Sequence, residues 1–162
     1  MRTLRREVRK FKKTTLEVIA TDRDPFKVLI SCILSLQTRD AVTAQTSRQL
    51  YAVAQTPREI LALPDRELRR LIYPSSFYNI KAGVIKGICR DLLERFEGRV
   101  PDTLEALTSM KGVGRKTANI VITLAYRKPG IAVDTHVHRI SNRLGWVKTK
   151  TPAQTEFALR AL

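Results

Sequence analysis

The sequence predicts an all-α fold, and three observations support this. Apolar residues recur at helical spacing along almost the whole chain, whereas alternating strand patterns are hard to find. Helix start signals recur, among them Asp24-Pro25 and the capping box Thr56-Pro57-Arg58-Glu59. The connections are short, without an internal repeat or a low-complexity linker. We therefore expect helices packed around one core.

The predicted helices follow one another closely. The first after the N-terminal segment begins at Asp24 and is apolar on nearly every side, which is typical of a central buried helix. Pro64 divides two short helices, Gly98 ends a long one, and Pro129-Gly130 stops the helix that follows Gly112-Val113-Gly114. The predicted segments are residues 24–34, 40–54, two between 57 and 72, 78–96, one from 102, 115–128 and 134–144.

The N-terminal segment and the composition indicate a polyanionic partner. Thirty basic residues face 15 acidic ones, a net charge of +15. This excess favours nucleic acid first and an anionic membrane second. Aromatic residues make up only 6%, which disfavours stacking platforms for single strands, and no apolar run reaches a membrane span. An amphipathic basic helix is predicted near the start, carrying Arg2, Arg5, Arg6, Arg9, Lys10, Lys12 and Lys13.

Two short stretches contain the most informative pair of residues. Met110-Lys111-Gly112-Val113-Gly114-Arg115-Lys116-Thr117 joins two apolar helical patterns through a tight turn. In the second stretch, Val133-Asp134-Thr135-His136, the aspartate lies eighteen residues after Lys116. Such a turn presents backbone N–H groups beside a helix N-terminus, which suits a phosphate. The helix dipole and the neighbouring basic residues disfavour an ammonium at Lys116, which favours a nucleophilic amine. Asp134 can act as a helix N-cap, as a catalytic carboxylate, or as both.

These stretches resemble the helix-hairpin-helix glycosylase superfamily, and endonuclease III-like members most of all. Leu34-Ser35-Leu36-Gln37-Thr38-Arg39-Asp40 and Tyr78-Asn79-Ile80-Lys81-Ala82 are similar to further family segments. The resemblance runs from about residue 24 to the end. Lys111 stands where the family usually has proline, and Ser76 where it usually has glycine.

The resemblance implies a fold and an activity. It implies a six-helix barrel domain at 22–131, containing the hairpin, and an incomplete second helical domain formed by 1–21 and 132–162. The implied enzyme is a base excision repair glycosylase with AP lyase activity. It would remove oxidised pyrimidines and cleave the abasic strand by β-elimination. Lys116 would be the nucleophile, and Asp134 would stabilise cationic charge and orient or deprotonate the lysine.

The implied DNA contacts surround this pair. Gln37 resembles the residue that fills the base stack, and Phe77 is either a second wedge or a core residue. The hairpin contacts are Lys111, Gly112, Val113, Gly114, Arg115 and Thr117. His136 is predicted to be buried near Asp134, and Trp146 to lie in the core. No metal site is predicted, because His136 and His138 point to different faces of a helix.

The end of the chain departs from the family. Related proteins continue into a segment with four cysteines that bind a [4Fe–4S] cluster, whereas this chain has only Cys32 and Cys89, predicted to be buried thiols. We therefore expect no cofactor in this chain, which is either C-terminally truncated or of a cluster-free lineage. Truncation would leave the apolar faces of the first helix and of residues 153–162 partly uncovered.

Partners and alternatives complete the prediction. The expected partner is double-stranded DNA with damaged bases or abasic sites, bound by a monomer in the cytoplasm, associated with the nucleoid in a prokaryote. One alternative is a non-catalytic helix-hairpin-helix module that only binds DNA. Another is a mismatch-specific glycosylase, against which Lys116 argues, because such relatives generally lack this lysine.

Overall fold

The computed structural model of the chain describes residues 14–162. Within this range the regular structure is entirely helical, which confirms the predicted fold class. The predicted basic helix of residues 2–13 lies outside the described residues. The elements are α2 (Thr15–Ile19), η1 (Ala20–Asp22), α3 (Pro25–Ser35), α4 (Asp40–Tyr51), α5 (Pro57–Ala62), α6 (Asp65–Ile72), α7 (Tyr78–Arg95), α8 (Leu104–Thr108), α9 (Arg115–Leu124), α10 (Thr135–Arg143) and α11 (Pro152–Arg160).

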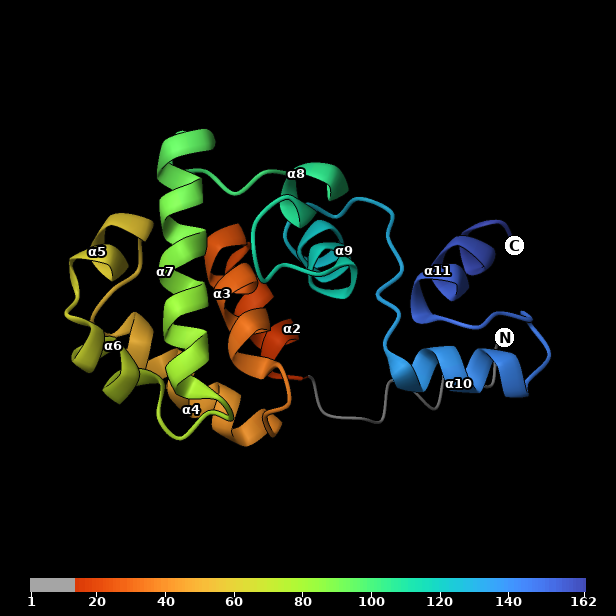
Figure 1. Cartoon of the computed structure of the whole chain (residues 1–162), viewed down its shortest axis with the longest axis horizontal. Coiled ribbons are helices and arrows are strands. Elements are labelled where there is room, and N and C mark those ends of the chain that lie inside the picture. Colours follow the sequence, from red (N-terminus) through yellow and green to blue (C-terminus); the bar gives the residue numbers. More distant parts are fainter. Residues whose placement is uncertain (1–13) are drawn as a thin grey trace.

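The helices form a larger and a smaller unit (Figure 1). In the larger unit α4 to α9 surround α3, which packs against α4, α7 and α9. The smaller unit consists of α10 and α11, and the extended segment 125–134 connects it to α9 (Figure 1). Between residues 22 and 131 the structure has seven helical segments, because Pro64 separates α5 from α6.

Helix α3 is the centre of the core, as its apolar sequence predicts. Asp24 accepts the backbone N–H groups of Phe26 and Lys27, and Pro25 occupies the first helical position. Eight of the eleven residues are buried, from Phe26 to Leu34 with the exception of Lys27. Because almost no side of this helix is exposed to solvent, the free carbonyl groups at its C-terminal end near Leu36 need hydrogen-bond donors from neighbouring elements.

Helix α2 differs from the predicted domain division. It contacts α3 and α4, and the Thr15 N–H donates to the Asp40 carboxylate at 3.1 Å. A capping box between Thr14 and Glu17 starts this helix. Residues 14–21 therefore pack in the larger unit, whereas the prediction assigned residues 1–21 to the smaller one. No helix among residues 14–162 is long and apolar enough to cross a membrane.

Candidate active site

The predicted hairpin connects α8 to α9 and is fixed to α7. Gly112 has a φ of +93°, and a Cβ built there would lie 2.5 Å from Cγ1 of Val84. Both features require glycine. Val113 is buried, and its N–H donates to the Met110 carbonyl oxygen at 3.1 Å. The turn therefore has a fixed shape against the longest helix.

The N-terminus of α9 is open to a ligand. Gly114 is its N-cap, and no side chain caps this end of the helix. Lys111, Gly112 and Gly114 are exposed. Uncapped N–H groups at the positive end of a helix dipole, beside an exposed lysine, form a suitable site for a phosphate.

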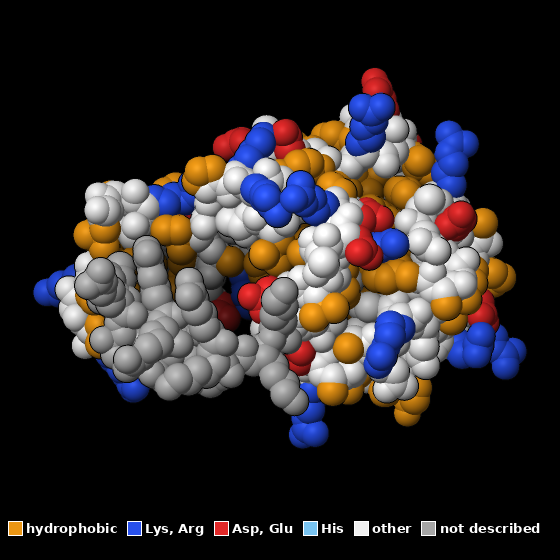
Figure 2. Space-filling view, turned by 180° about the vertical axis from the view of Figure 1, so that it is seen from behind, with side chains coloured by type: hydrophobic (Ala, Val, Ile, Leu, Met, Phe, Trp, Pro, Cys, Tyr) orange, Lys and Arg blue, Asp and Glu red, His pale blue; other side chains and the backbone are white. Residues whose placement is uncertain are grey.

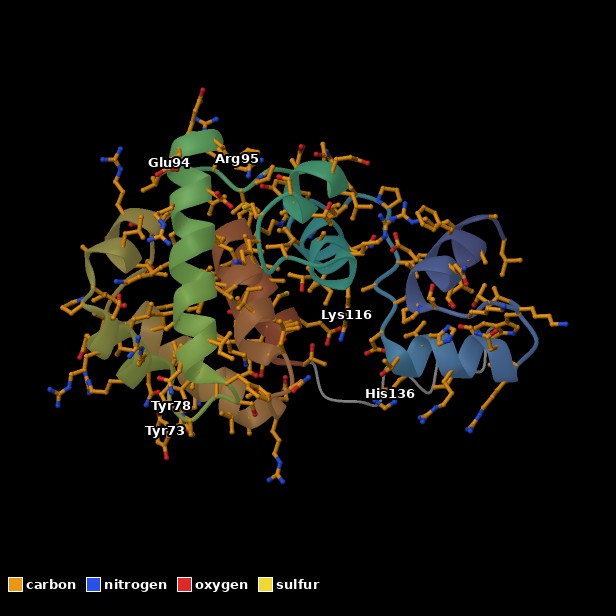
Figure 3. The ribbon with its side chains drawn as sticks, viewed as in Figure 1. Tyr73, Tyr78, Glu94, Arg95, Lys116 and His136 are labelled. Atoms are coloured by element: carbon orange, nitrogen blue, oxygen red, sulfur yellow. The ribbon has the colours of Figure 1, made fainter. Side chains whose placement is uncertain are left out.

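Lys116 and Asp134 meet between the two units. Lys116 Nζ lies 3.2 Å from Oδ2 of Asp134, and their side chains are 44% and 32% exposed. Asp134 is also the N-cap of α10, since its Oδ1 accepts the N–H groups of His136 at 3.0 Å and Val137 at 2.9 Å. Lys116 extends from α9 toward the side of the molecule where α10 begins (Figure 3). One carboxylate therefore caps a helix and holds an amine that solvent can reach.

The surroundings of Asp134 keep it ionised. Partial burial raises the pKa of this carboxyl. Hydrogen bonds from Val137, Lys116 and His136, together with the charge of Lys116, lower it by more, so the pKa lies below its usual value of 3.8. A carboxylate with a lowered pKa is a weak base and a good partner for positive charge. This favours charge stabilisation over proton abstraction among the roles considered for Asp134.

Arg115, predicted to contact DNA, directs its side chain into the protein. Its Nε and Nη2 each donate to the Glu156 carboxylate at 2.8 Å, and its guanidinium lies 4.6 Å from the ring centre of Phe157. The side chains of Val113 and Thr117 are buried. Within the predicted contact set, these three residues can offer DNA their backbone more readily than their side chains.

A polar network attaches α9 to the smaller unit and to the segment before Asp134. Glu156 is only 2% exposed and also pairs with Arg160 at 3.2 Å. Arg160 in turn donates to Oδ1 of the buried Asn119 at 2.8 Å, and this oxygen accepts the Ile131 N–H at 3.2 Å. Asn119 donates to the Arg115 carbonyl oxygen at 3.0 Å. The network thereby fixes the relative positions of α9, α11 and the chain that leads to Asp134.

Exposure decides several of the other predictions. Gln37 is exposed, and Phe77 is 61% exposed, so Phe77 is not a core residue. His136 was predicted to be buried, but it is exposed and its Nδ1 lies 3.3 Å from Nη2 of Arg139. Trp146 was predicted to lie in the core, but it is 55% exposed. Both corrections concern the smaller unit, whose two helices contact each other more than any other described element.

The two cysteines do not fit an iron–sulfur cluster. Cys32 in α3 and Cys89 in α7 are buried, and burial raises the pKa of each thiol to about 12. Cluster ligands are thiolates, and four are needed. The described residues also contain no group of three or more His, Cys, Asp or Glu side chains placed to hold a metal ion.

Three buried polar residues escaped the sequence prediction, namely Lys81, Asn119 and Glu156. Position 81 lies four residues before Ile85 and eight before Cys89, so helical spacing places this lysine on the buried face of α7. That charge on an apolar face is a signal that the sequence does contain. Glu156 offers no comparable signal, because its partner Arg115 is 41 residues away.

Comparison with known proteins agrees with this geometry. Residues 30–162 match the family described as HhH-GPD superfamily base excision DNA repair protein. The chain belongs to this superfamily. It is 54% identical over 141 residues to endonuclease III of Thermotoga maritima, covering 87% of this chain and 66% of that protein.

Solved structures show the same fold. A structure titled a non-covalent endonuclease III–DNA complex superposes with a TM-score of 0.79 at 38% identity, covering 84% of this chain and 64% of the other. A second, titled a trapped endonuclease III–DNA covalent intermediate, has a TM-score of 0.80 with the same identity and coverage. The chain thus spans slightly less than two thirds of the length of these relatives.

Proposed function

We propose that this chain carries the catalytic centre of an endonuclease III-like DNA glycosylase with AP lyase activity, acting on oxidised pyrimidines in duplex DNA. The observation that carries the proposal is the 3.2 Å contact between Lys116 Nζ and Asp134 Oδ2 beside the uncapped N-terminus of α9. An amine, a carboxylate and a phosphate site converge there. Similarity to an endonuclease III captured as a covalent DNA intermediate also supports it.

The amine would act as the nucleophile. After the ammonium of Lys116 loses a proton to solvent, its nitrogen attacks C1′ of the sugar. The N–C1′ bond forms as the glycosidic bond breaks, and the base leaves with that electron pair and takes up a proton. The sugar ring then opens to an iminium. Loss of a C2′ proton and departure of the 3′ phosphate complete β-elimination, and water releases the lysine.

Asp134 would stabilise the positive charge that develops on the sugar during these reaction steps. Its Oδ2 faces the amine, while its Oδ1 is held by two backbone N–H groups. An anchored carboxylate with a lowered pKa does not need to reorganise as charge develops on the sugar. The hairpin would hold a phosphate next to the target nucleotide without reading its base.

The proposed partner is damaged double-stranded DNA, bound by a monomer in the compartment that contains the chromosome. The net charge of +15 supports a polyanion. Lys and Arg side chains appear at several places on the face shown in Figure 2, interspersed with exposed apolar side chains. A base inside a duplex must leave the stack before it reaches Lys116. Light scattering on a DNA complex would determine the stoichiometry.

Borohydride trapping on abasic duplex DNA tests the reaction. Reduction fixes an imine as a covalent adduct, so the wild type should crosslink and Lys116→Gln should not. Lys148→Gln removes the same charge from an exposed residue outside the site and serves as the matched control. Trapping by Lys116→Gln would exclude Lys116 as the nucleophile.

The same experiment separates the proposal from its alternatives. A wild-type chain that binds duplex DNA without crosslinking would be a non-catalytic hairpin module. For a chain that does crosslink, a panel of oligonucleotides with oxidised pyrimidines or mismatches would identify the base that it excises. Excision of mismatched normal bases, without excision of oxidised pyrimidines, would contradict the proposed specificity.

A further inference from the structure

A buried lysine connects α7 to the end of α3. Lys81 is 5% exposed, and its Nζ donates to the carbonyl oxygens of Leu34 at 2.6 Å and Leu36 at 2.8 Å, and to Oγ1 of Thr38 at 2.9 Å. These acceptors belong to the C-terminal turn of α3 and the loop after it. The lysine therefore supplies donors that α3 lacks at its own end.

The arrangement suits an ammonium. Its three N–H groups match three acceptors, and the negative end of the α3 dipole favours a cation there. All three acceptors are neutral, and no carboxylate among residues 14–162 lies in ion-pair contact with Lys81. Removal from water without a counter-ion is costly. A cost of this kind indicates that the contact serves the geometry of the loop.

The loop that Lys81 holds presents Gln37. This residue lies between the acceptors at Leu36 and Thr38, and its φ of +51° is rare for a residue with a side chain. Its side chain is exposed. Lys81 thus holds the Leu36 backbone on one side of this left-handed glutamine and the Thr38 side chain on the other.

The same lysine is linked to Phe77. Phe77 is the N-cap of α7 with a φ of +56°, and its carbonyl oxygen accepts the backbone N–H of Lys81 at 2.9 Å, as in any first helical turn. The neighbouring Ser76 N–H donates to Oγ1 of Thr38 at 3.1 Å, the oxygen that Lys81 also contacts. The loop before Phe77 and the loop that carries Gln37 are therefore joined through the Thr38 hydroxyl, which the Lys81 ammonium holds.

Gln37 and Phe77 line one groove. It has a volume of about 470 Å³, is mainly apolar, and reaches the hairpin at Gly112. Leu36, Phe77 and Ile80 are 39%, 61% and 66% exposed. Apolar and amide side chains held at fixed angles beside a phosphate-binding turn are suited to entering a base stack.

We propose that Lys81 is a positioning residue, which fixes the backbone from which Gln37 and Phe77 enter the DNA stack when a nucleotide is extruded. The inference rests on the proposed function. Lys81 does not touch the reacting atoms, which belong to the site at Lys116 and Asp134. Its contribution concerns duplex DNA, because an abasic single strand has no stack to fill.

The test compares Lys81→Met on two substrates. Borohydride trapping rates are measured on abasic duplex and on the same abasic strand unpaired. We expect the duplex rate to fall about tenfold or more, as for a misplaced contact, and the single-strand rate to stay within about twofold. A second readout is the fluorescence of 2-aminopurine next to a tetrahydrofuran site, where the variant should unstack the probe less than the wild type.

Lys86→Met is the matched control. Lys86 lies on the same helix and likewise donates to a carbonyl oxygen, that of Leu63 at 2.7 Å, and to Asp65 at 2.5 Å, away from the groove. Its duplex-to-single-strand ratio should equal that of the wild type. Thr38→Val removes one acceptor and the link to Ser76 but keeps the side-chain shape. It replaces Lys81→Met as the test if that variant does not fold, and it should lower the duplex-to-single-strand ratio of trapping rates.

The outcomes separate the two proposals. Equal losses of trapping on both substrates, or an unchanged ratio in both groove variants, would overturn the positioning role. A wild type that traps neither substrate would overturn the proposed function. The 2-aminopurine signal, which needs no imine, would then decide for or against Lys81 by itself.

Discussion

Asp134 and Lys116 are joined through one carboxylate oxygen only. Oδ2 lies 3.2 Å from Nζ, whereas Oδ1 accepts the two N–H groups that begin α10. The start of α10 therefore sets the orientation of the carboxylate, and the carboxylate in turn holds the amine of Lys116. This division allows the capping and the proposed catalytic contributions to be separated by substitution.

Asp134→Asn should spare the fold and slow base excision. The asparagine oxygen can still cap α10, since asparagine and aspartate are comparable N-caps. The charge that faces Lys116 is lost, and we expect excision to fall about a hundredfold. Single-turnover assays and thermal melts of the same preparation measure both. Wild-type turnover at an unchanged melting temperature would leave Asp134 as a cap only.

Gly112→Ala should distort the hairpin. The added methyl group would clash with Val84, and an alanine at this position would have an unfavourable φ of +93°. We expect lower stability and weaker duplex binding, measured by thermal melting and fluorescence anisotropy. In the double variant Gly112→Ala/Val84→Ala the steric clash is removed and the φ remains, so recovery should be partial. Full recovery would show that the backbone angle is unimportant.

Glu156→Gln should loosen the attachment of α11 to α9. It leaves the Arg115 and Arg160 guanidinium groups without their shared carboxylate. We expect the free energy of unfolding to fall by about 2 kcal/mol. This is less than for a fully buried ion pair, because both arginines are more than a third exposed. Urea unfolding measures it. Excision should fall as well, and an unchanged rate would show that this contact does not position Asp134.

Acid should weaken the same attachment. Burial raises the pKa of Glu156, but hydrogen bonds from Arg115 and Asn119 and the charges of both arginines lower it below its usual 4.5. A group whose pKa is lower in the folded state adds stability above its unfolded pKa and loses it as the pH falls through the folded value. Asp134 behaves alike. Melting temperatures should therefore drop below about pH 4.5, and less steeply in Glu156→Gln.

Duplex binding should depend strongly on salt. Each phosphate contact contributes a slope of roughly −0.9 in log K against log salt concentration. Lys111→Gln removes one exposed charge beside the hairpin and should make the slope shallower by about that amount. Anisotropy titrations at several salt concentrations measure it. A flat response in the wild type would contradict a footprint dominated by phosphates.

The helices were predictable because their starts are local. Asp24, Thr56 and Asp134 each cap the helix that the sequence assigned to them. The Lys116–Asp134 contact also followed from short motifs and a family resemblance, not from geometry.

Exposure and long-range pairing were less predictable. Trp146 belongs to a small unit that leaves it uncovered, and Arg115 turns from the predicted DNA face to Glu156. Such outcomes depend on which surfaces meet in three dimensions, and periodicity within one helix does not contain that information.

The proposed reacting pair lies at a seam. Lys116 belongs to the larger unit, whereas Asp134 is the last residue of the connecting segment 125–134 and the N-cap of α10 in the smaller unit. Neither unit contains both groups, so a small rotation of one unit against the other changes the amine–carboxylate separation without unfolding any helix. Substitutions between the two units should therefore lower the excision rate before they lower the melting temperature. Residues along this seam, catalytic or not, offer a means of tuning turnover.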